Sequence, residues 1–357
     1  MDYQKQLDKL LELTCDKKAS DLHISCGHPP ILRIDTKLTD VEGEEVVTPE
    51  MAEGLAFVLM TEAEKEKFLK ERDIDLAYEF GGRARFRANI FFQSKKISIA
   101  MRLIPQGIRN MEELGLPPIM HYFVQAKQGF VLITGATSQG KSTTLAAIID
   151  EINQIRREHI ITIEHPIEYV FEDNQCIIDQ REVYQDSRSF PEALRAALRE
   201  DPNVIMVGEL RDFETISTAI TAAETGHLVF GTLHTSSAAK TVDRIIDAFP
   251  AGQQAQIRTM LSESLKGVLC QQLLKRIDKP GRLAALEILF CKTSIANLIR
   301  EAKTFQIPSM IQTGKGEGMQ LLDQAIMDFL MKKQISPEEA YLKANDKNAF
   351  ERFIKKT

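Results

Sequence analysis

The residues with the most specific chemistry form a glycine-containing loop between an apolar run, 130–134, and a helix-forming run, 145–149. The loop matches the pattern G-x-x-x-x-G-K-[ST] and reads Gly135-Ala136-Thr137-Ser138-Gln139-Gly140-Lys141-Ser142-Thr143. Backbone N–H groups at the start of a helix can surround phosphate oxygens, and the helix dipole favours negative charge there. We expect Lys141 to reach the β- and γ-phosphates and Ser142 to hold Mg²⁺. The alternative is a chance match in a glycine turn, against which the strand before and the helix after the loop both argue.

Hydrolysis of a bound nucleotide also requires carboxylates that order the metal shell and polarise a water molecule. The apolar run 204–208 ends in Glu209, the pattern of a Walker B element, so Glu209 is a second candidate for the Mg²⁺ shell. Another run, 161–164, is followed by Glu168 just past Pro166, and Glu168 could polarise the attacking water. The alternatives are an exposed strand end for Glu209 and a solvated turn residue for Glu168.

Three cationic or titratable side chains could complete such a site. His234 follows the apolar run 228–233, where a residue sensing the γ-phosphate would stand, although a lone histidine at a strand end is more often a structural hydrogen-bonding residue. Arg87 and Arg102 lie in the first third of the chain, and arginine is suited to bidentate phosphate contact and to neutralising charge in a transition state. The pattern alone favours a solvated sheet face for both arginines.

The elements that must position these residues fall into two regions. Residues 1–104 predict a small antiparallel sheet with helices packed on it, an α+β unit. One helix is predicted from the spacing of apolar residues over 7–13, and two more are predicted at 49–60 and 62–71. The predicted strands are 21–25, 30–35, 75–80, 83–93 and 97–104. Residues 105–118 are rich in proline and glycine and are predicted to be a linker.

Residues 119–357 predict an α/β domain, because strand-like apolar runs alternate with helical segments. The predicted strands are 131–134, 159–164, 204–209, 228–234 and 283–289. Such alternation indicates a parallel sheet covered by helices on both faces. From about residue 293 the chain is predicted to be helical to its end, including 320–333 and a helix that starts at Ser336-Pro337.

Composition narrows the class of protein. A chain of 357 residues is too long for one ordinary core, and its net charge of −6 argues against a nucleic-acid partner. No stretch approaches the ~20 apolar residues that span a bilayer, and the start lacks the features of a signal peptide. We therefore expect a cytoplasmic protein without direct membrane insertion. The five cysteines are far apart and are expected to be reduced and mostly buried.

Taken together, the motifs resemble those of the type IV pilus retraction ATPases, the PilT family, over nearly the whole chain. The matching segments are 19–23, 29–35, 135–143, 163–168, 180–183, 208–212, 226–235 and 298–301. The resemblance implies a PAS-like N-terminal domain and a RecA-like motor domain in a homohexameric ring, with ATP bound between the two domains. It also implies a motor that drives pilus retraction and twitching motility. Docking on an inner-membrane platform protein, and partnership with a related motor ATPase, follow from the same resemblance.

The resemblance also implies roles for individual residues. Glu168 would be the catalytic glutamate, Glu209 the Walker B glutamate and His234 the residue of the histidine box. Arg87 and Arg102 would be the arginines that reach the phosphates.

The sequence departs from the family pattern at several positions. Ala136, Ser138 and Gln139 replace Pro, Gly and Ser in the phosphate loop, His165 replaces an Asp, and Ala296 replaces an Arg near the C-terminus. If the loop requires a positive φ at position 138, serine is strained there. Two alternatives follow: a regulatory ring subunit that binds nucleotide with little turnover, or a motor of the extension or type II secretion branch.

Overall fold

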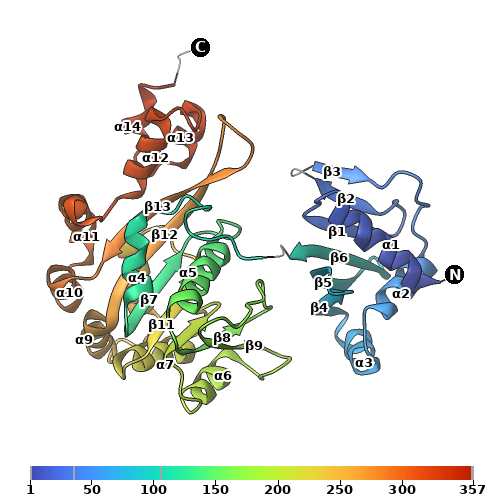
Figure 1. Cartoon of the computed structure of the whole chain (residues 1–357), viewed down its shortest axis with the longest axis horizontal. Helices are drawn as coiled ribbons and strands as arrows, with labels where there is room; N and C mark the ends of the chain where they lie inside the picture. Colours follow the sequence, from blue (N-terminus) through green and yellow to red (C-terminus); the bar gives the residue numbers. More distant parts are fainter. Residues whose placement is uncertain (1, 35–36, 105–106, 355–357) are drawn as a thin grey trace. The chain divides into compact units, whose positions relative to one another are not determined.

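The computed structural model describes residues 2–34, 37–104 and 107–354, and the chain divides into two compact units, Met1–Gly107 and Ile108–Thr357 (Figure 1). Each unit has a hydrophobic core built only from its own residues. The first two residues of the predicted linker, 105–106, and the end of the predicted strand 30–35 lie outside the described residues.

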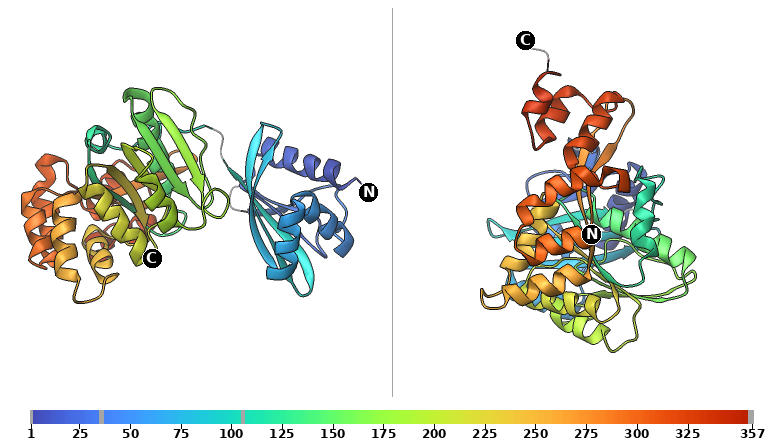
Figure 2. Two further views of the ribbon diagram at one scale, coloured as in Figure 1. Left: turned by 90° about the horizontal axis from the view of Figure 1, so that it is seen from below. Right: turned by 90° about the vertical axis from the view of Figure 1, so that its left-hand side faces the viewer.

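The first unit is a six-stranded antiparallel sheet in the order β3-β2-β1-β6-β5-β4, with helices α1–α3 on one side of it (Figure 2). Its elements are α1 (Tyr3–Asp16), β1 (Asp21–Ser25), β2 (Ile31–Ile34), β3 (Lys37–Asp40), α2 (Pro49–Val58), α3 (Glu62–Glu71), β4 (Asp73–Phe80), β5 (Ala84–Gln93) and β6 (Lys96–Ile104). The predicted α+β unit is confirmed, and β3 is an additional strand that the sequence did not predict.

Local sequence explains the two helices α2 and α3. Thr48 accepts a hydrogen bond from the backbone N–H of Met51, and Pro49 occupies the first turn of α2. Thr61 and Glu64 form a capping box at the start of α3. Along β5, alternate residues are buried against these helices, which leaves the arginine-bearing face of the sheet outside this core.

The second unit is a seven-stranded sheet in the order β13-β12-β7-β11-β10-β8-β9. Its strands are β7 (Gly129–Thr134), β8 (His159–Glu164), β9 (Ile177–Glu182), β10 (Val204–Val207), β11 (Leu228–Leu233), β12 (Leu265–Lys275) and β13 (Arg282–Phe290). Every residue of β7, β10 and β11 is buried, and neighbouring side chains of a strand point to opposite faces, so both faces are covered. The predicted α/β class with a sheet covered on both faces is confirmed.

Three details of the predicted sheet were wrong. The sequence missed β9 and β12, which extend the sheet on either side. It also placed the segment 283–289 in a parallel sheet, whereas β13 pairs with β12 in antiparallel register. The remaining strand pairs of this sheet are parallel.

Helices of the second unit connect these strands and then continue alone to the C-terminus. They are α4 (His121–Gln125), α5 (Lys141–Ile155), α6 (Phe190–Ala197), α7 (Phe213–Glu224), α8 (Ala238–Asp247), α9 (Gln254–Ser264), α10 (Thr293–Arg300), α11 (Ile307–Thr313), α12 (Leu322–Met331), α13 (Pro337–Lys343) and α14 (Asn348–Glu351), with short 3-10 turns at Pro118–Met120, Thr304–Gln306 and Gly314–Glu317. The predicted C-terminal helical region is confirmed. Helices α12–α14 share a small core with the end of the β12–β13 hairpin (Figure 1).

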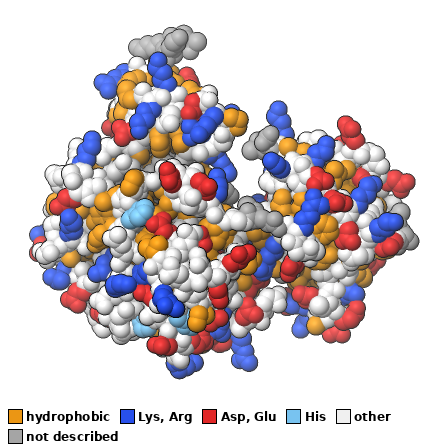
Figure 3. Space-filling view, in the orientation of Figure 1, with side chains coloured by type: hydrophobic (Ala, Val, Ile, Leu, Met, Phe, Trp, Pro, Cys, Tyr) orange, Lys and Arg blue, Asp and Glu red, His pale blue; other side chains and the backbone are white. Residues whose placement is uncertain are grey.

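On the face in Figure 3, Lys and Arg side chains are interspersed with Asp and Glu. All five cysteines are free thiols; Cys26, Cys176 and Cys270 are buried, and Cys15 and Cys291 are half-buried. Within the described ranges, none of the helices combines the length and apolar character that crossing a bilayer requires.

Candidate active site

The phosphate-loop motif lies where the sequence predicted it, between the buried strand β7 and helix α5. Two of its positions require glycine. Gly135 has φ 144°, and a Cβ there would lie 2.3 Å from the backbone oxygen of Gln271. Gly140 has φ 80° and stands immediately before the first residue of α5. The crest of the loop, Ala136 to Ser138, is exposed.

Lys141 is buried at the start of α5, and its ammonium group points back into the loop. Its Nζ donates hydrogen bonds of 2.8 Å to the carbonyl of Gly135 and 3.0 Å to that of Ala136. Burial lowers the pKa of this ammonium group, while the negative charges of Glu209 and Glu168 oppose that shift. The lysine is therefore within electrostatic reach of both predicted acidic residues.

The other loop positions have distinct surroundings. Ser138 has φ 63°, the left-handed conformation that the sequence identified as strained for serine. Ser142, in the first turn of α5, is half-buried and provides a hydroxyl group beside Lys141. Thr143 shares a 2.8 Å hydrogen bond with the hydroxyl of Tyr169.

Glu209 and His234 meet at the carboxyl ends of the neighbouring parallel strands β10 and β11. His234 Nε2 lies 3.2 Å from Glu209 Oε1, and Arg211 Nη2 lies 2.7 Å from Glu209 Oε2. Burial alone would raise the pKa of Glu209, but the Arg211 hydrogen bond and the surrounding positive charges hold it below its ordinary value. Glu209 is thus an ionised carboxylate near the phosphate loop.

Glu164 and Glu168 lie at and just beyond the carboxyl end of β8. Glu168 is exposed, and its backbone N–H donates a 3.4 Å hydrogen bond to Glu164 Oε2. Glu164 is buried and also accepts hydrogen bonds from Thr162 Oγ1 at 2.8 Å and Gln180 Nε2 at 3.3 Å. Burial raises the pKa of Glu164 to about 7 despite these bonds.

The two predicted arginines lie side by side in the first unit. Arg87 on β5 and Arg102 on β6 are direct cross-strand partners. Arg87 Nε lies 3.5 Å from Asp75 Oδ1, and Arg102 Nε lies 3.0 Å from Asp21 Oδ1. The structure brings these arginines together on one sheet, and it brings the phosphate loop, Glu168, Glu209 and His234 together in the other unit.

The second unit has oxygen-bearing side chains that suit a nucleotide bound with Mg²⁺. The ion prefers oxygen ligands and usually keeps several waters and phosphate oxygens, so few protein ligands are needed. The hydroxyl of Ser142 and the carboxylate of Glu209 are oxygen groups of the kind that could hold the ion. Among the residues that the structure describes, no cluster of three or more His, Cys, Asp or Glu side chains could hold a metal by itself.

Sequence reasoning missed Gln271 on β12, which contacts the phosphate loop. It is 4% exposed, and both ends of its side-chain amide are hydrogen bonded to the loop or to α5. The sequence signal was a pair of glutamines, Gln271 and Gln272, within an otherwise apolar run, 267–274. That pattern does not reveal which segment of the chain lies opposite.

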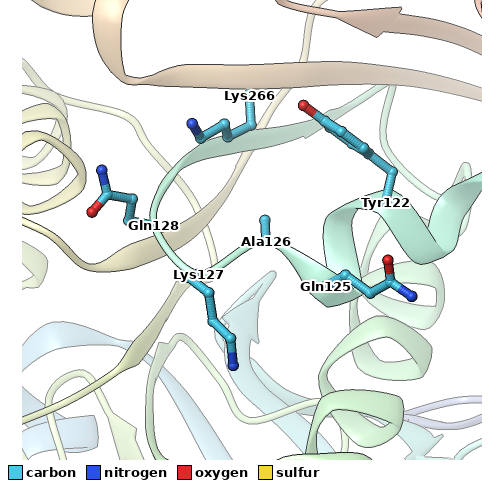
Figure 4. Close-up of a pocket in the computed structure, with 6 residues that line it drawn as sticks. All are labelled: Tyr122, Gln125, Ala126, Lys127, Gln128 and Lys266. Atoms are coloured by element: carbon cyan, nitrogen blue, oxygen red, sulfur yellow. The ribbon is translucent and has the colours of Figure 1, made fainter.

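A separate pocket, drawn in Figure 4, lies next to the first residue of β7. It is lined by Tyr122, Gln125, Ala126, Lys127, Gln128 and Lys266. Gly129, the first residue of β7, follows this lining directly, whereas the phosphate loop follows the last residue of the same strand. The pocket therefore does not belong to the predicted nucleotide site.

Comparison with known proteins gives consistent matches over both units. A model of the family described as type II/IV secretion system protein matches residues 3–306. The "Type IV pilus retractation ATPase PilT" of Pseudomonas aeruginosa is 47% identical over 343 residues, which are 95% of this chain and 98% of that protein. The "Twitching motility protein" of Neisseria gonorrhoeae is 45% identical over 317 residues, 89% of this chain and 84% of that protein. The crystal structure of the pilus retraction motor PilT with bound ADP has a TM-score of 0.90 and 42% identity, covering 97% of this chain and 98% of its own.

Proposed function

The chain belongs to the family of type II/IV secretion system proteins, and on that premise we propose that it is the ATP-hydrolysing motor of type IV pilus retraction. The observation that carries this proposal is the full-length similarity to a pilus retraction ATPase, joined to a phosphate loop whose Lys141 lies within reach of two acidic residues. The solved relative binds ADP, which supports nucleotide binding by this chain.

In the proposed site, the loop 135–143 holds the phosphates and Lys141 contacts the β- and γ-phosphates. Ser142 and Glu209 would hold Mg²⁺, which when bound would supply positive charge at the phosphate oxygens. Glu168, exposed and without a competing ion pair of its own among the described residues, acts as the general base for the attacking water. His234 orients Glu209 through their 3.2 Å contact and senses the γ-phosphate.

Arg87 and Arg102 supply positive charge to the phosphates in a homohexameric ring. The ring acts at the inner membrane by docking on a platform protein, from the cytoplasmic side and alongside a related motor ATPase. The similarity to retraction and twitching proteins supports this arrangement.

Glu168→Gln tests the chemistry of the site. Mg²⁺-dependent phosphate release from purified protein should fall by about 10²–10⁴-fold, because a general base is lost. ADP binding should stay unchanged, because the amide has the size of the carboxyl group. The matched control is Glu172→Gln, an exposed glutamate four residues along the chain. Undiminished phosphate release by Glu168→Gln would remove Glu168 from its role.

Two further outcomes separate the alternatives. Wild-type protein that binds ADP but never releases phosphate would favour the regulatory ring subunit, for which the strained Ser138 is the motivating observation. In the host, loss of twitching with surface pili retained supports retraction. Loss of the pili themselves on deletion of the gene would indicate the extension branch instead.

A further inference from the structure

Strand β12 continues past the end of its neighbour β7. The pairing of the two strands ends at Cys270 opposite Thr134. From Gln271 onward, the chain that faces this side of β12 is the phosphate loop: Gly135 approaches so closely that a Cβ would lie 2.3 Å from the Gln271 oxygen. The loop therefore takes the place of a neighbouring strand.

The side chain of Gln271 joins two points of the loop and helix. Its Oε1 accepts a 2.7 Å hydrogen bond from the hydroxyl of Thr144, and its Nε2 donates a 2.7 Å hydrogen bond to the carbonyl of Gln139. The side chain is almost fully buried, so leaving either end of its amide unpaired would be unfavourable.

The side chain of Gln139 completes the connection from the opposite direction. Its Oε1 accepts a 2.7 Å hydrogen bond from the backbone N–H of Leu273 on β12. The loop thus accepts two hydrogen bonds from the strand, one from the backbone N–H of Leu273 and one from the side chain of Gln271. A shorter side chain at position 139 would not span this distance.

This connection lies next to the strained position of the loop. Ser138 has φ 63° and directly precedes Gln139. A non-glycine residue keeps such a conformation only where the surrounding structure fixes it, whereas glycine adopts it without strain. The hydrogen bonds of Gln139 and Gln271 fix the chain immediately after Ser138.

We propose that Gln139 and Gln271 are positioning residues, which hold the phosphate loop in its binding conformation and thereby allow serine at position 138. The inference rests on the proposed function only in that the loop binds a nucleotide. Without these hydrogen bonds the loop populates other conformations. The apparent affinity for the nucleotide then falls in proportion to the fraction of molecules whose loop stays in the binding conformation. A bound nucleotide restores the loop, so KM rises more than kcat falls.

The first experiment compares two neighbouring glutamines in the full-length protein. Gln271→Met removes both amide hydrogen bonds at similar volume, and Gln272→Met is the matched control on the next residue of β12. Isothermal titration with ADP should give a Kd about tenfold higher for Gln271→Met, as expected for two lost hydrogen bonds, and a Kd within about twofold of wild type for Gln272→Met. Equal ADP affinity of Gln271→Met and wild type would overturn the proposal.

The second experiment tests the link to Ser138 by rescue. Gln139→Ser should weaken ADP binding about fivefold and speed amide hydrogen exchange of residues 135–141 without nucleotide. Adding Ser138→Gly should restore both measurements, because glycine needs no external support at φ 63°. A double variant as impaired as Gln139→Ser would refute the proposal. A motor that fails to hydrolyse ATP would contradict the proposed function without altering these readouts.

Discussion

At the scale of single residues, Glu164 combines burial with a position beside the candidate site. Its carboxyl group accepts hydrogen bonds from Thr162, Gln180 and the backbone of Glu168, yet it lacks a cationic partner among the described residues. Its environment therefore favours the neutral form, and burial raises its pKa to about 7. The neighbouring Glu209, which has Arg211 beside it, is affected in the opposite direction.

This difference predicts a pH dependence of stability. In the unfolded chain the Glu164 carboxyl titrates near its ordinary 4.5, and in the folded chain near about 7, so the folded state binds more protons between these values. Wild-type stability should fall as pH rises through this window and then level off. Glu164→Gln should be more stable relative to wild type at about pH 8 than at about pH 5, by on the order of 3 kcal/mol.

Urea unfolding at both pH values measures this effect. The control is Glu172→Gln, whose carboxyl group is exposed and should give the same difference from wild type at each pH. Parallel pH profiles of Glu164→Gln and wild type would mean that Glu164 is already ionised in the folded protein at neutral pH.

Single residues with a chemical motif could be predicted from the sequence, and those defined by contacts could not. Apolar runs in the sequence mark the predicted site residues, which are the loop at 135–143, Glu168, Glu209 and His234. The carboxyl ends of neighbouring parallel strands then bring these residues together. Their catalytic roles stay predictions. Gln271 was not predictable because its importance comes from the order of strands in the sheet, which places β12 beside the loop.

At the scale of elements, the β12–β13 hairpin is packed so closely that one position admits only glycine. A Cβ on Gly267 would lie 2.4 Å from the backbone oxygen of Leu289 and 2.6 Å from the ring of Phe123. One of these atoms belongs to the backbone and the other to an aromatic ring, so neither can move aside as the end of a flexible side chain could. Strand β12 and helix α4 are therefore held together through the absence of a side chain at this position.

We expect Gly267→Ala to destabilise the second unit by about 1–3 kcal/mol, the range for overpacking a close contact. Gly252→Ala provides the control, because a Cβ there would meet nothing within 4 Å, and its effect should stay within about 0.5 kcal/mol. Equilibrium denaturation gives both values. A Gly267→Ala protein as stable as the control variant would contradict the packing argument.

Strands β9 and β12 and the direction of β13 were not predicted, because pairing within the sheet determines them more than local sequence does. Strand β12 follows α9 directly at Leu265 and contains Leu, Lys and Gln, which favour helices, so its pairing with β7 overrides local preference. Strand β9 is a half-exposed edge strand with a polar sequence. The direction of β13 is set by its short connection to β12, since a short loop joins antiparallel strands.

At the scale of the whole molecule, the two units have separate cores. The core of the first unit draws all its members from residues 3–103, and the cores of the second unit draw theirs from 108–353. Each core is thus built from residues of one unit, which is the condition for a domain that folds alone.

A fragment of residues 1–107 should therefore fold by itself. Its circular dichroism should show helix and strand, and its thermal unfolding should be cooperative, because the antiparallel sheet and α1–α3 are complete within it. The fragment 108–357 is the companion sample and should also unfold cooperatively. A first fragment without a cooperative transition would mean that the boundary at Gly107 divides one folding unit.

The five cysteines are distributed over both units, so their reactivity can report on each unit separately. Cys15 and Cys26 belong to one unit, whereas Cys176, Cys270 and Cys291 belong to the other, and burial raises the pKa of Cys291 to about 12. A thiolate is the form that reacts with maleimides, so the native protein should label slowly at neutral pH. Mass spectrometry of partly alkylated peptides, taken at increasing urea concentration, would then show for each cysteine which of the two units unfolds first.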